Sequence, residues 1–201
     1  MNRRLVLAAL WSAAQFLAVP ALAQNAAPAA PAQQVVLQTP AGSIVIELDP
    51  RAPITSANFK RYVDEGRFDG AVFYRSMALA GGNGLIQGGV QNDPARELPP
   101  IAHEPTSQTG LRHTDGVVSM ARYDPGTATG EFFIIVGDGI GSLDASATDS
   151  GFAAFGRVVL GMDVVRAILA APKSPTAGEG VMRGQMLEPT IPITDAYSPA
   201  P

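Results

Sequence analysis

The spacing of apolar residues after position 34 predicts, first, an antiparallel hairpin. The segments VVLQT and SIVIELD are separated by a Pro-Ala-Gly turn, and Ile44, Ile46 and Leu48 occupy every other position of the second segment. Side chains of a strand alternate between its two faces, so this period of two is typical of a hairpin with one buried face. We expect the hairpin to cover residues 35–48.

Two later segments have the period of a helix instead. In APITSANFKRYVDEGRF, Phe59, Tyr62 and Val63 lie at positions i, i+3 and i+4, and GMDVVRAILAAP repeats such a pattern about a hundred residues later. Thr55 or Ser56 can cap the start of the first segment, and the second is followed by a proline. We predict one helix in each segment.

Between residues 71 and 160 the chain consists of short apolar segments separated by glycines, namely AVFYRSM, GLIQGGV, GVVSMAR, EFFIIVG and FAAFGRVV. Several such segments at short spacing predict a β-barrel or β-sandwich. MLEPTIPITDA, near the C-terminus, predicts a last strand at a sheet edge, because Pro189 and Pro192 have no N–H to donate. The fold class is therefore mainly β.

The first 34 residues lie outside this pattern. Arg3 and Arg4 precede an apolar run that ends in Ala-Leu-Ala at residue 23, which predicts a secretory signal peptide over 1–23. The alternative is a membrane anchor, but Gln15 and Pro20 interrupt the run, and about 20 apolar residues are needed to cross a bilayer. The expected division is a signal at 1–23, an Ala/Pro/Gln-rich linker at 24–34, one domain at 35–196 and a flexible tail at 197–201.

Charge and composition narrow the partners. The net charge of −4 becomes −6 when residues 1–23 are removed, because they contain two arginines and no acidic residue. Lys60 and Lys173 are the only lysines and the arginines are scattered, so neither nucleic acid nor an anionic membrane is an expected partner. The chain has no cysteine, which excludes disulfides, thiolate metal sites and a cysteine nucleophile.

Familiar catalytic motifs are absent from the sequence. It contains no GxSxG, HExxH, P-loop or EF-hand pattern, and GDGIGS has Ser142 where a dinucleotide-binding loop needs its third glycine. His103 and His113 lie in polar segments and are interpreted as loop residues with ordinary hydrogen bonds. We therefore expect no metal and no cofactor.

One arginine stands out against this background. Arg75 follows the strand-like residues Val72, Phe73 and Tyr74, and its guanidinium stays charged. This inventory is compatible with a reaction that needs no proton transfer, such as rotation about the amide bond before proline. A fixed donor aimed at the prolyl nitrogen stabilises the twisted amide more than either planar form.

The segments FYRSM, GLIQGG, GVVSMARYDPGTATGEFFIIVGD, SLD and GFAAFGRVVLGMDVVRAI resemble, in this order, the signature blocks of the cyclophilin-type peptidyl-prolyl cis–trans isomerases. The resemblance covers about residues 35–196. It implies a closed eight-stranded antiparallel β-barrel capped by two α-helices. It also implies isomerisation of Xaa-Pro bonds in unfolded or flexible polypeptides. Together with the signal peptide, GMDVV is similar to exported bacterial members, which implies a periplasmic folding catalyst without stable membrane insertion.

The resemblance also implies roles for individual residues. Arg75 would be the catalytic arginine, and Gln87 would hold the peptide backbone and orient that arginine. The implied substrate-binding residues are Phe73, Leu85, Ala121, Arg122, Phe133, Leu143 and Phe152. Among them, Leu85, Phe133 and Leu143 correspond to walls of the proline pocket, and the main chain at 121–122 would pair with the peptide.

The sequence also departs from the family pattern. Gly84 stands where many members have an aromatic residue, Ser142 where many have tryptophan, and Glu131 where glutamine is usual. Tyr123 can narrow a neighbouring subsite, and Phe152 can restore aromatic surface. These changes imply altered substrate preference and weak binding of the cyclic peptide cyclosporin.

Two alternatives to an isomerase remain. The first is a non-catalytic cyclophilin-like module that binds Pro-containing segments of an envelope protein, although such modules usually lack the arginine. The second is a carrier barrel for a small molecule, which would need a hollow interior. Inward side chains such as Phe73, Ile134 and Val158 favour a filled barrel.

Overall fold

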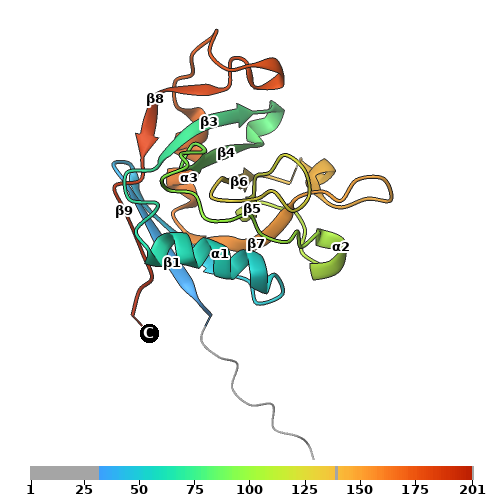
Figure 1. The fold of residues 1–201 in the computed structure, drawn as a ribbon. Coiled ribbons are helices and arrows are strands. Elements are labelled where there is room, and N and C mark those ends of the chain that lie inside the picture. Colours follow the sequence, from blue (N-terminus) through green and yellow to red (C-terminus); the bar gives the residue numbers. More distant parts are fainter. Residues whose placement is uncertain (1–31, 139, 201) are drawn as a thin grey trace, which may run out of the picture. The chain divides into compact units, whose positions relative to one another are not determined.

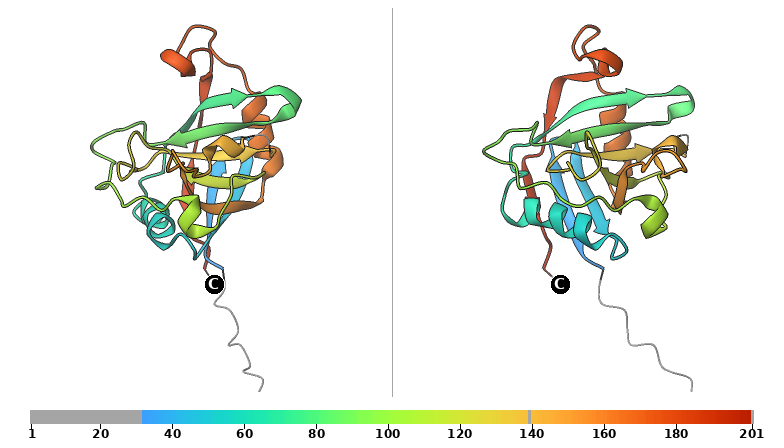
Figure 2. Two further views of the ribbon diagram at one scale, coloured as in Figure 1. Left: turned by 90° about the vertical axis from the view of Figure 1, so that its right-hand side faces the viewer. Right: turned by 45° about the vertical axis from the view of Figure 1, so that its right-hand side comes forward.

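The computed structural model describes residues 32–138 and 140–200. These residues form one strongly curled antiparallel sheet with two main helices, which confirms the mainly β fold with two helices (Figures 1 and 2). The sheet is not a closed barrel, because β8 and β9 are edge strands that do not pair with each other. The strand order is β8-β3-β4-β6-β5-β7-β2-β1-β9. The strands are β1 (Gln34–Thr39), β2 (Gly42–Leu48), β3 (Val72–Ala78), β4 (Gly84–Gly89), β5 (Val117–Met120), β6 (Phe132–Val136), β7 (Ala153–Leu160), β8 (Met186–Pro192) and β9 (Asp195–Tyr197).

The predicted first hairpin is present as β1 and β2. Its register pairs Val36 with Val45 and closes at Thr39 and Gly42. Ile44 and Ile46 are fully buried, so the period-two pattern identified the inward face correctly. The expected signal peptide, residues 1–23, lies outside the described residues.

The sheet has nine strands rather than the expected eight, because the last strand is divided. β8 pairs with β3 at one edge of the sheet, and β9 pairs with β1 at the other. Between them, Ile193 donates its N–H to the carbonyl of Ala71, and Thr194 donates its N–H to that of Gln38. One short stretch of chain therefore joins the two edges of the curled sheet.

The two main helices are α1 (Pro53–Asp64) and α3 (Met162–Ala170), and α2 (Thr106–Thr109) is a single turn. Phe59, Tyr62 and Val63 of α1 are buried against the sheet, as their spacing predicted. Within the described residues, no helix is long and apolar enough to cross a bilayer.

The cap of α1 differs from the expectation. Neither Thr55 nor Ser56 caps the helix with its side chain. The buried carboxylate of Glu104 accepts the N–H of Thr55 at 2.7 Å and that of Ile54 at 3.2 Å. A negative charge at a helix N-terminus is favourable, because the free N–H groups and the helix dipole are positive there.

The core inside the curled sheet is built around aromatic rings. Phe59 contacts Phe68, Phe132 and Phe155 with ring centroids 4.9–5.1 Å apart. Phe73 joins this cluster through Phe132, at 5.7 Å. The interior of the sheet is thus filled by side chains.

Candidate active site

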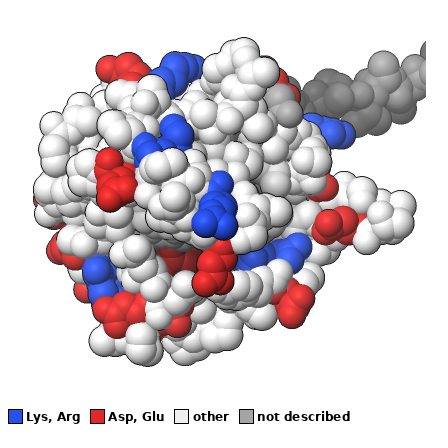
Figure 3. All heavy atoms as spheres, turned by 90° about the horizontal axis from the view of Figure 1, so that it is seen from above, with Lys and Arg blue, Asp and Glu red and all other residues white. Residues whose placement is uncertain are grey.

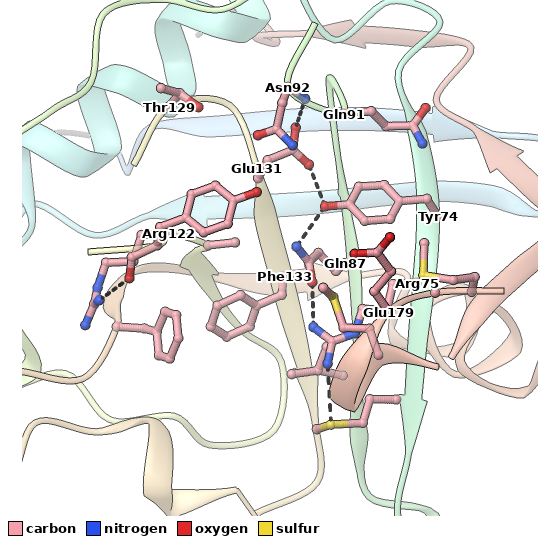
Figure 4. A pocket seen from close by; sticks show the side chains of 18 of the residues that line it. Tyr74, Arg75, Gln87, Gln91, Asn92, Arg122, Thr129, Glu131, Phe133 and Glu179 are labelled. Carbon is pink, nitrogen blue, oxygen red and sulfur yellow. Dashed lines mark hydrogen bonds between the residues drawn. The ribbon is translucent and has the colours of Figure 1, made fainter. Parts of the chain in front are cut away.

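A groove of about 690 Å³ lies on the outside of the sheet, beside β3, β4 and β6 (Figure 4). Strands β3 and β4 contribute Arg75 and Gln87, and β6 contributes Phe133. The segment after β5 and the loop before β8 complete its walls. Six of the seven predicted substrate-binding residues line it, namely Leu85, Ala121, Arg122, Phe133, Leu143 and Phe152.

Phe73, the seventh, does not reach the groove. It is fully buried in the core, although in a regular strand it would share a face with Arg75. The pairing of β3 shifts register between these two residues, against both β4 and β8. This β-bulge turns both Tyr74 and Arg75 toward the groove and leaves Phe73 inside.

The apolar part of the groove is a small cluster separate from the main core. Leu85 and Phe133 are buried together with Ile135 and Ile140. Phe152 meets Phe133 edge to face, with ring centroids 5.4 Å apart. Met77, Ala121, Leu143 and Phe152 pack against this cluster while remaining partly exposed. An apolar ring that enters here would be buried on several sides.

Arg75 is held at both edges of its guanidinium. Its Nη1 donates to Gln87 Oε1 at 2.8 Å, and its Nε donates to Gln185 Oε1 at 2.9 Å. Nη2 lies 3.8 Å from the sulfur of Met77. Partial burial lowers the pKa of Arg75 from its usual value, which for this group still leaves the charge in place at neutral pH.

Hydrogen bonds extend this arrangement along the groove. Gln87 Nε2 donates to the Tyr74 hydroxyl at 2.7 Å, and that hydroxyl donates to Glu131 Oε2 at 2.7 Å. Burial raises the pKa of Glu131 against the effect of the Tyr74 hydrogen bond. Burial, followed by the nearby Glu131 charge, also raises the pKa of Tyr74, so its hydroxyl keeps its proton.

The segment after β5 uses its polar groups partly within the protein. Ala121 donates its N–H to the carbonyl of Glu131, so this N–H is not available to a peptide. The Arg122 side chain lies over the Phe152 ring, 4.9 Å from its centroid, and donates to Ser150 Oγ at 3.1 Å. Arg122 therefore supports the loop that carries Phe152.

His113 is buried, which its polar sequence surroundings did not indicate. Its Nδ1 lies 2.7 Å from Asp144 Oδ1, and its Nε2 lies 2.9 Å from Ser119 Oγ. These residue types occur in hydrolases, but Ser119 is fully buried and cannot meet a substrate. The imidazole stacks on Phe133 and so supports the pocket wall from behind.

Charged side chains are spread over the upper face of the molecule. Viewed from above, acidic and basic side chains are interspersed and neither sign gathers into a patch (Figure 3). The described residues contain no group of three or more acidic or histidine side chains placed to hold a metal ion. The groove is distinguished instead by its apolar wall and its hydrogen-bonded arginine.

Comparisons with known proteins agree with this geometry. Residues 34–196 match the family described as cyclophilin type peptidyl-prolyl cis-trans isomerase. A peptidyl-prolyl cis-trans isomerase of Acinetobacter baylyi is 41% identical over 145 residues, which cover 70% of this chain and 73% of that protein. Isomerase B of Escherichia coli is 37% identical over 141 residues, covering 65% and 80%.

A solved cyclophilin-type isomerase from Cryptosporidium parvum shares the fold, with a TM-score of 0.67 and 20% identity. The match covers 84% of this chain and all of that one. The chain belongs to the cyclophilin-type peptidyl-prolyl cis–trans isomerases, and it is an enzyme of this class.

Proposed function

We propose that the groove binds Xaa-Pro segments with the proline ring against Leu85, Phe133 and Leu143, and that Arg75 is the catalytic residue. The observation that carries this proposal is the placement of a guanidinium, fixed by Gln87 and Gln185, beside a separate apolar pocket. Proline offers no charge to recognise, so its ring is held by burial of apolar surface.

The chemistry follows from the amide bond itself. Rotation about the bond before proline must overcome about 20 kcal/mol of partial double-bond character. In the twisted state the prolyl nitrogen regains its lone pair and becomes a hydrogen-bond acceptor. Arg75 has five N–H groups, of which Gln87 and Gln185 accept one each. A remaining N–H can donate to that nitrogen, and this contact is stronger in the twisted state than in either planar one.

We propose further that the protein is exported and assists the folding of exported proteins. The charged head, apolar run and Ala-Leu-Ala end of residues 1–23 support a cleaved signal. A periplasmic location, a linker that ends before β1 begins at Gln34 and a tail that follows β9 after Tyr197 belong to the same proposal. N-terminal sequencing of protein secreted by a bacterial host should begin at Gln24. Retention of the segment 1–23 would contradict cleavage.

An isomerase assay on a short Xaa-Pro peptide tests the catalytic assignment. The mature wild-type chain should accelerate isomerisation, and Arg75→Ala should lower kcat/KM by at least about tenfold, or about 1.4 kcal/mol of transition-state stabilisation. Arg75→Lys should also be impaired, because an ammonium cannot engage both glutamines and the substrate in one plane. Equal rates for wild type and Arg75→Ala would refute the role of Arg75.

The same assay separates the enzyme from a non-catalytic binding module. A module would bind the peptide without accelerating isomerisation, whereas the fixed Arg75 beside the pocket favours turnover. A titration of the peptide by NMR provides both values, since line positions give the affinity and exchange between cis and trans signals gives the rate.

A further inference from the structure

Four side chains form a continuous hydrogen-bonded chain along the groove (Figure 4). It runs from Arg75 through Gln87 and Tyr74 to Glu131, with distances of 2.8, 2.7 and 2.7 Å. The other oxygen of Glu131 accepts the backbone N–H of Asn92 at 3.2 Å. The chain thus connects the guanidinium to a carboxylate that is only 7% exposed.

The two ends of this chain fix its direction. A guanidinium can only donate, and an ionised carboxylate can only accept. Between them, the Tyr74 hydroxyl must donate to Glu131 and accept from Gln87. The Gln87 amide must then turn its NH₂ toward Tyr74 and its oxygen toward Arg75. A rotated amide would point an NH₂ group at the guanidinium, where two donors would face each other.

We propose that Tyr74 and Glu131 are positioning residues, which fix the amide orientation of Gln87 and through it the catalytic guanidinium of Arg75. This inference rests on the proposed function of Arg75. Neither residue needs to contact the substrate for this effect. The β-bulge of β3 makes the chain possible, because it turns adjacent residues, Tyr74 and Arg75, to the same side.

At position 131, where the hydrogen-bonded chain ends, a carboxylate fits better than an amide. Glu131 accepts from two sides at once, from Tyr74 through Oε2 and from Asn92 through Oε1. Glutamine has one oxygen, so one of these two donors would face an NH₂ group. When that donor is the Tyr74 hydroxyl, the phenol must turn its proton toward Gln87, and the amide of Gln87 is no longer held in one orientation.

Protonation of Glu131 should loosen the orientation of Gln87 as a glutamine at position 131 would, because a protonated carboxyl group also has one acceptor site fewer. The charged and titratable groups around Glu131 are Tyr74 on β3, Tyr62 on α1, and Glu97 in the segment after β4. The positive charge of Arg75 lowers the pKa of Tyr74 and so opposes the effect of Glu131 on that hydroxyl. Burial raises the pKa of Glu131, so this loss of order should set in above the usual pH range of glutamate.

Tyr74→Phe tests the chain at its centre. The variant keeps the ring and removes the hydroxyl that joins Gln87 to Glu131. We expect kcat to fall by about tenfold while KM changes by less than about twofold, because the apolar pocket is untouched. Tyr197→Phe is the matched control, since it removes a tyrosine hydroxyl on β9, outside the groove.

Glu131→Gln tests the far end through the pH profile. The kcat of the wild type should fall on the acidic side toward the value of Glu131→Gln, whose own kcat should be several-fold lower and flat over that range. Glu47→Gln on β2 is the control for loss of a carboxylate elsewhere. The double variant Tyr74→Phe/Glu131→Gln should be no slower than Tyr74→Phe, because both changes break one chain.

The outcomes separate this inference from the function on which it rests. An inactive wild-type chain would overturn the proposed function and the positioning role together. A wild type that needs Arg75 but tolerates Tyr74→Phe and Glu131→Gln with unchanged kcat and pH profile would overturn the positioning role alone. A fall in both kcat and folded fraction for Tyr74→Phe would leave the Glu131→Gln pH profile to decide, and a flat wild-type profile would then count against the proposal.

Discussion

Among single residues, Arg75 on β3 and Gly84 on β4 determine the shape of the site. Arg75 faces the groove because the β-bulge changes the alternation of β3. Gly84, at the start of β4, has φ = 154°, and a Cβ built there would lie 2.2 Å from the Met77 carbonyl oxygen. An aromatic side chain at position 84 is therefore incompatible with this backbone, and the pocket wall must come from elsewhere.

Ser142 and Gly84 together predict weak binding of cyclosporin. Ser142 is exposed and offers no indole N–H, and Gly84 offers no aromatic wall. A missing hydrogen bond costs about 0.5–1.5 kcal/mol, and lost apolar contact adds a similar amount. We expect binding weaker than that of tryptophan-bearing relatives by roughly ten- to several hundred-fold, with turnover retained.

Ser142→Trp should recover part of this affinity in an inhibition assay, whereas Gly84→Phe should mainly destabilise the protein because of the Met77 contact. Inhibition of the unmodified protein as tight as that of tryptophan-bearing relatives would show that Phe152 or the segment 145–150 replaces the missing surface.

At the scale of elements, the periodic segments were predictable and the connections between them were not. The hairpin β1–β2 and the helices α1 and α3 follow from local apolar spacing, and the structure confirms them. The bulge in β3 depends on pairing with β4 and β8 at once. Likewise, Glu104 caps α1 from about fifty residues away, which no local pattern could indicate.

In the candidate site, too, the residues were predictable from the sequence and the contacts between distant segments were not. The resemblance indicated Arg75, Gln87 and the pocket walls, and the structure brings these residues to one groove. The connection of Arg75 to Gln185 could not be foreseen, because that glutamine lies 110 positions later in a loop. The sequence identified Glu131 as an unusual residue, but its hydrogen bond to Tyr74 could not be predicted without knowing the register of the strands.

The loop before β8 supports a prediction on client binding. Met182 lines the groove, and its neighbour Val181 is 87% exposed. Exposed apolar residues beside a groove can contact apolar stretches of an unfolded chain. Val181→Ser should weaken binding of an unfolded protein several-fold, in line with about 1 kcal/mol of lost apolar burial, and leave kcat/KM on a tetrapeptide unchanged.

Leu160→Ser is the matched control for this loop, because Leu160 is 65% exposed on β7 and does not line the groove. Competition of an unfolded protein against the tetrapeptide measures the affinity. Equal inhibition constants for Val181→Ser and wild type would limit the client surface to the groove itself.

At the scale of the whole molecule, stability should depend on pH through His113. Burial lowers its pKa in the folded state, although the hydrogen bond to Asp144 opposes this effect. As pH falls below about 6.5, the unfolded chain takes up a proton that the folded chain does not, so the free energy of unfolding decreases. The decrease ends at the folded-state pKa and amounts to about 1.4 kcal/mol for each unit of lowering. Glu131, whose pKa is raised, acts in the opposite sense and loses its stabilising contribution as pH rises through its folded-state value.

Urea unfolding at a series of pH values can isolate the histidine contribution. His113→Gln should be less stable than wild type at pH 7, because an amide does not fit both Asp144 and Ser119 as the imidazole does, and the difference should shrink as the pH is lowered from 6.5. His103→Gln, at a partly buried site bonded to the Ser150 carbonyl, serves as the control for loss of an imidazole elsewhere in the fold. Parallel curves for wild type and His113→Gln would mean that His113 binds its proton equally well in both states. The imidazole would then be charged within the fold at acidic pH, paired with Asp144, and the wall behind Phe133 would be an ion pair and not a neutral contact.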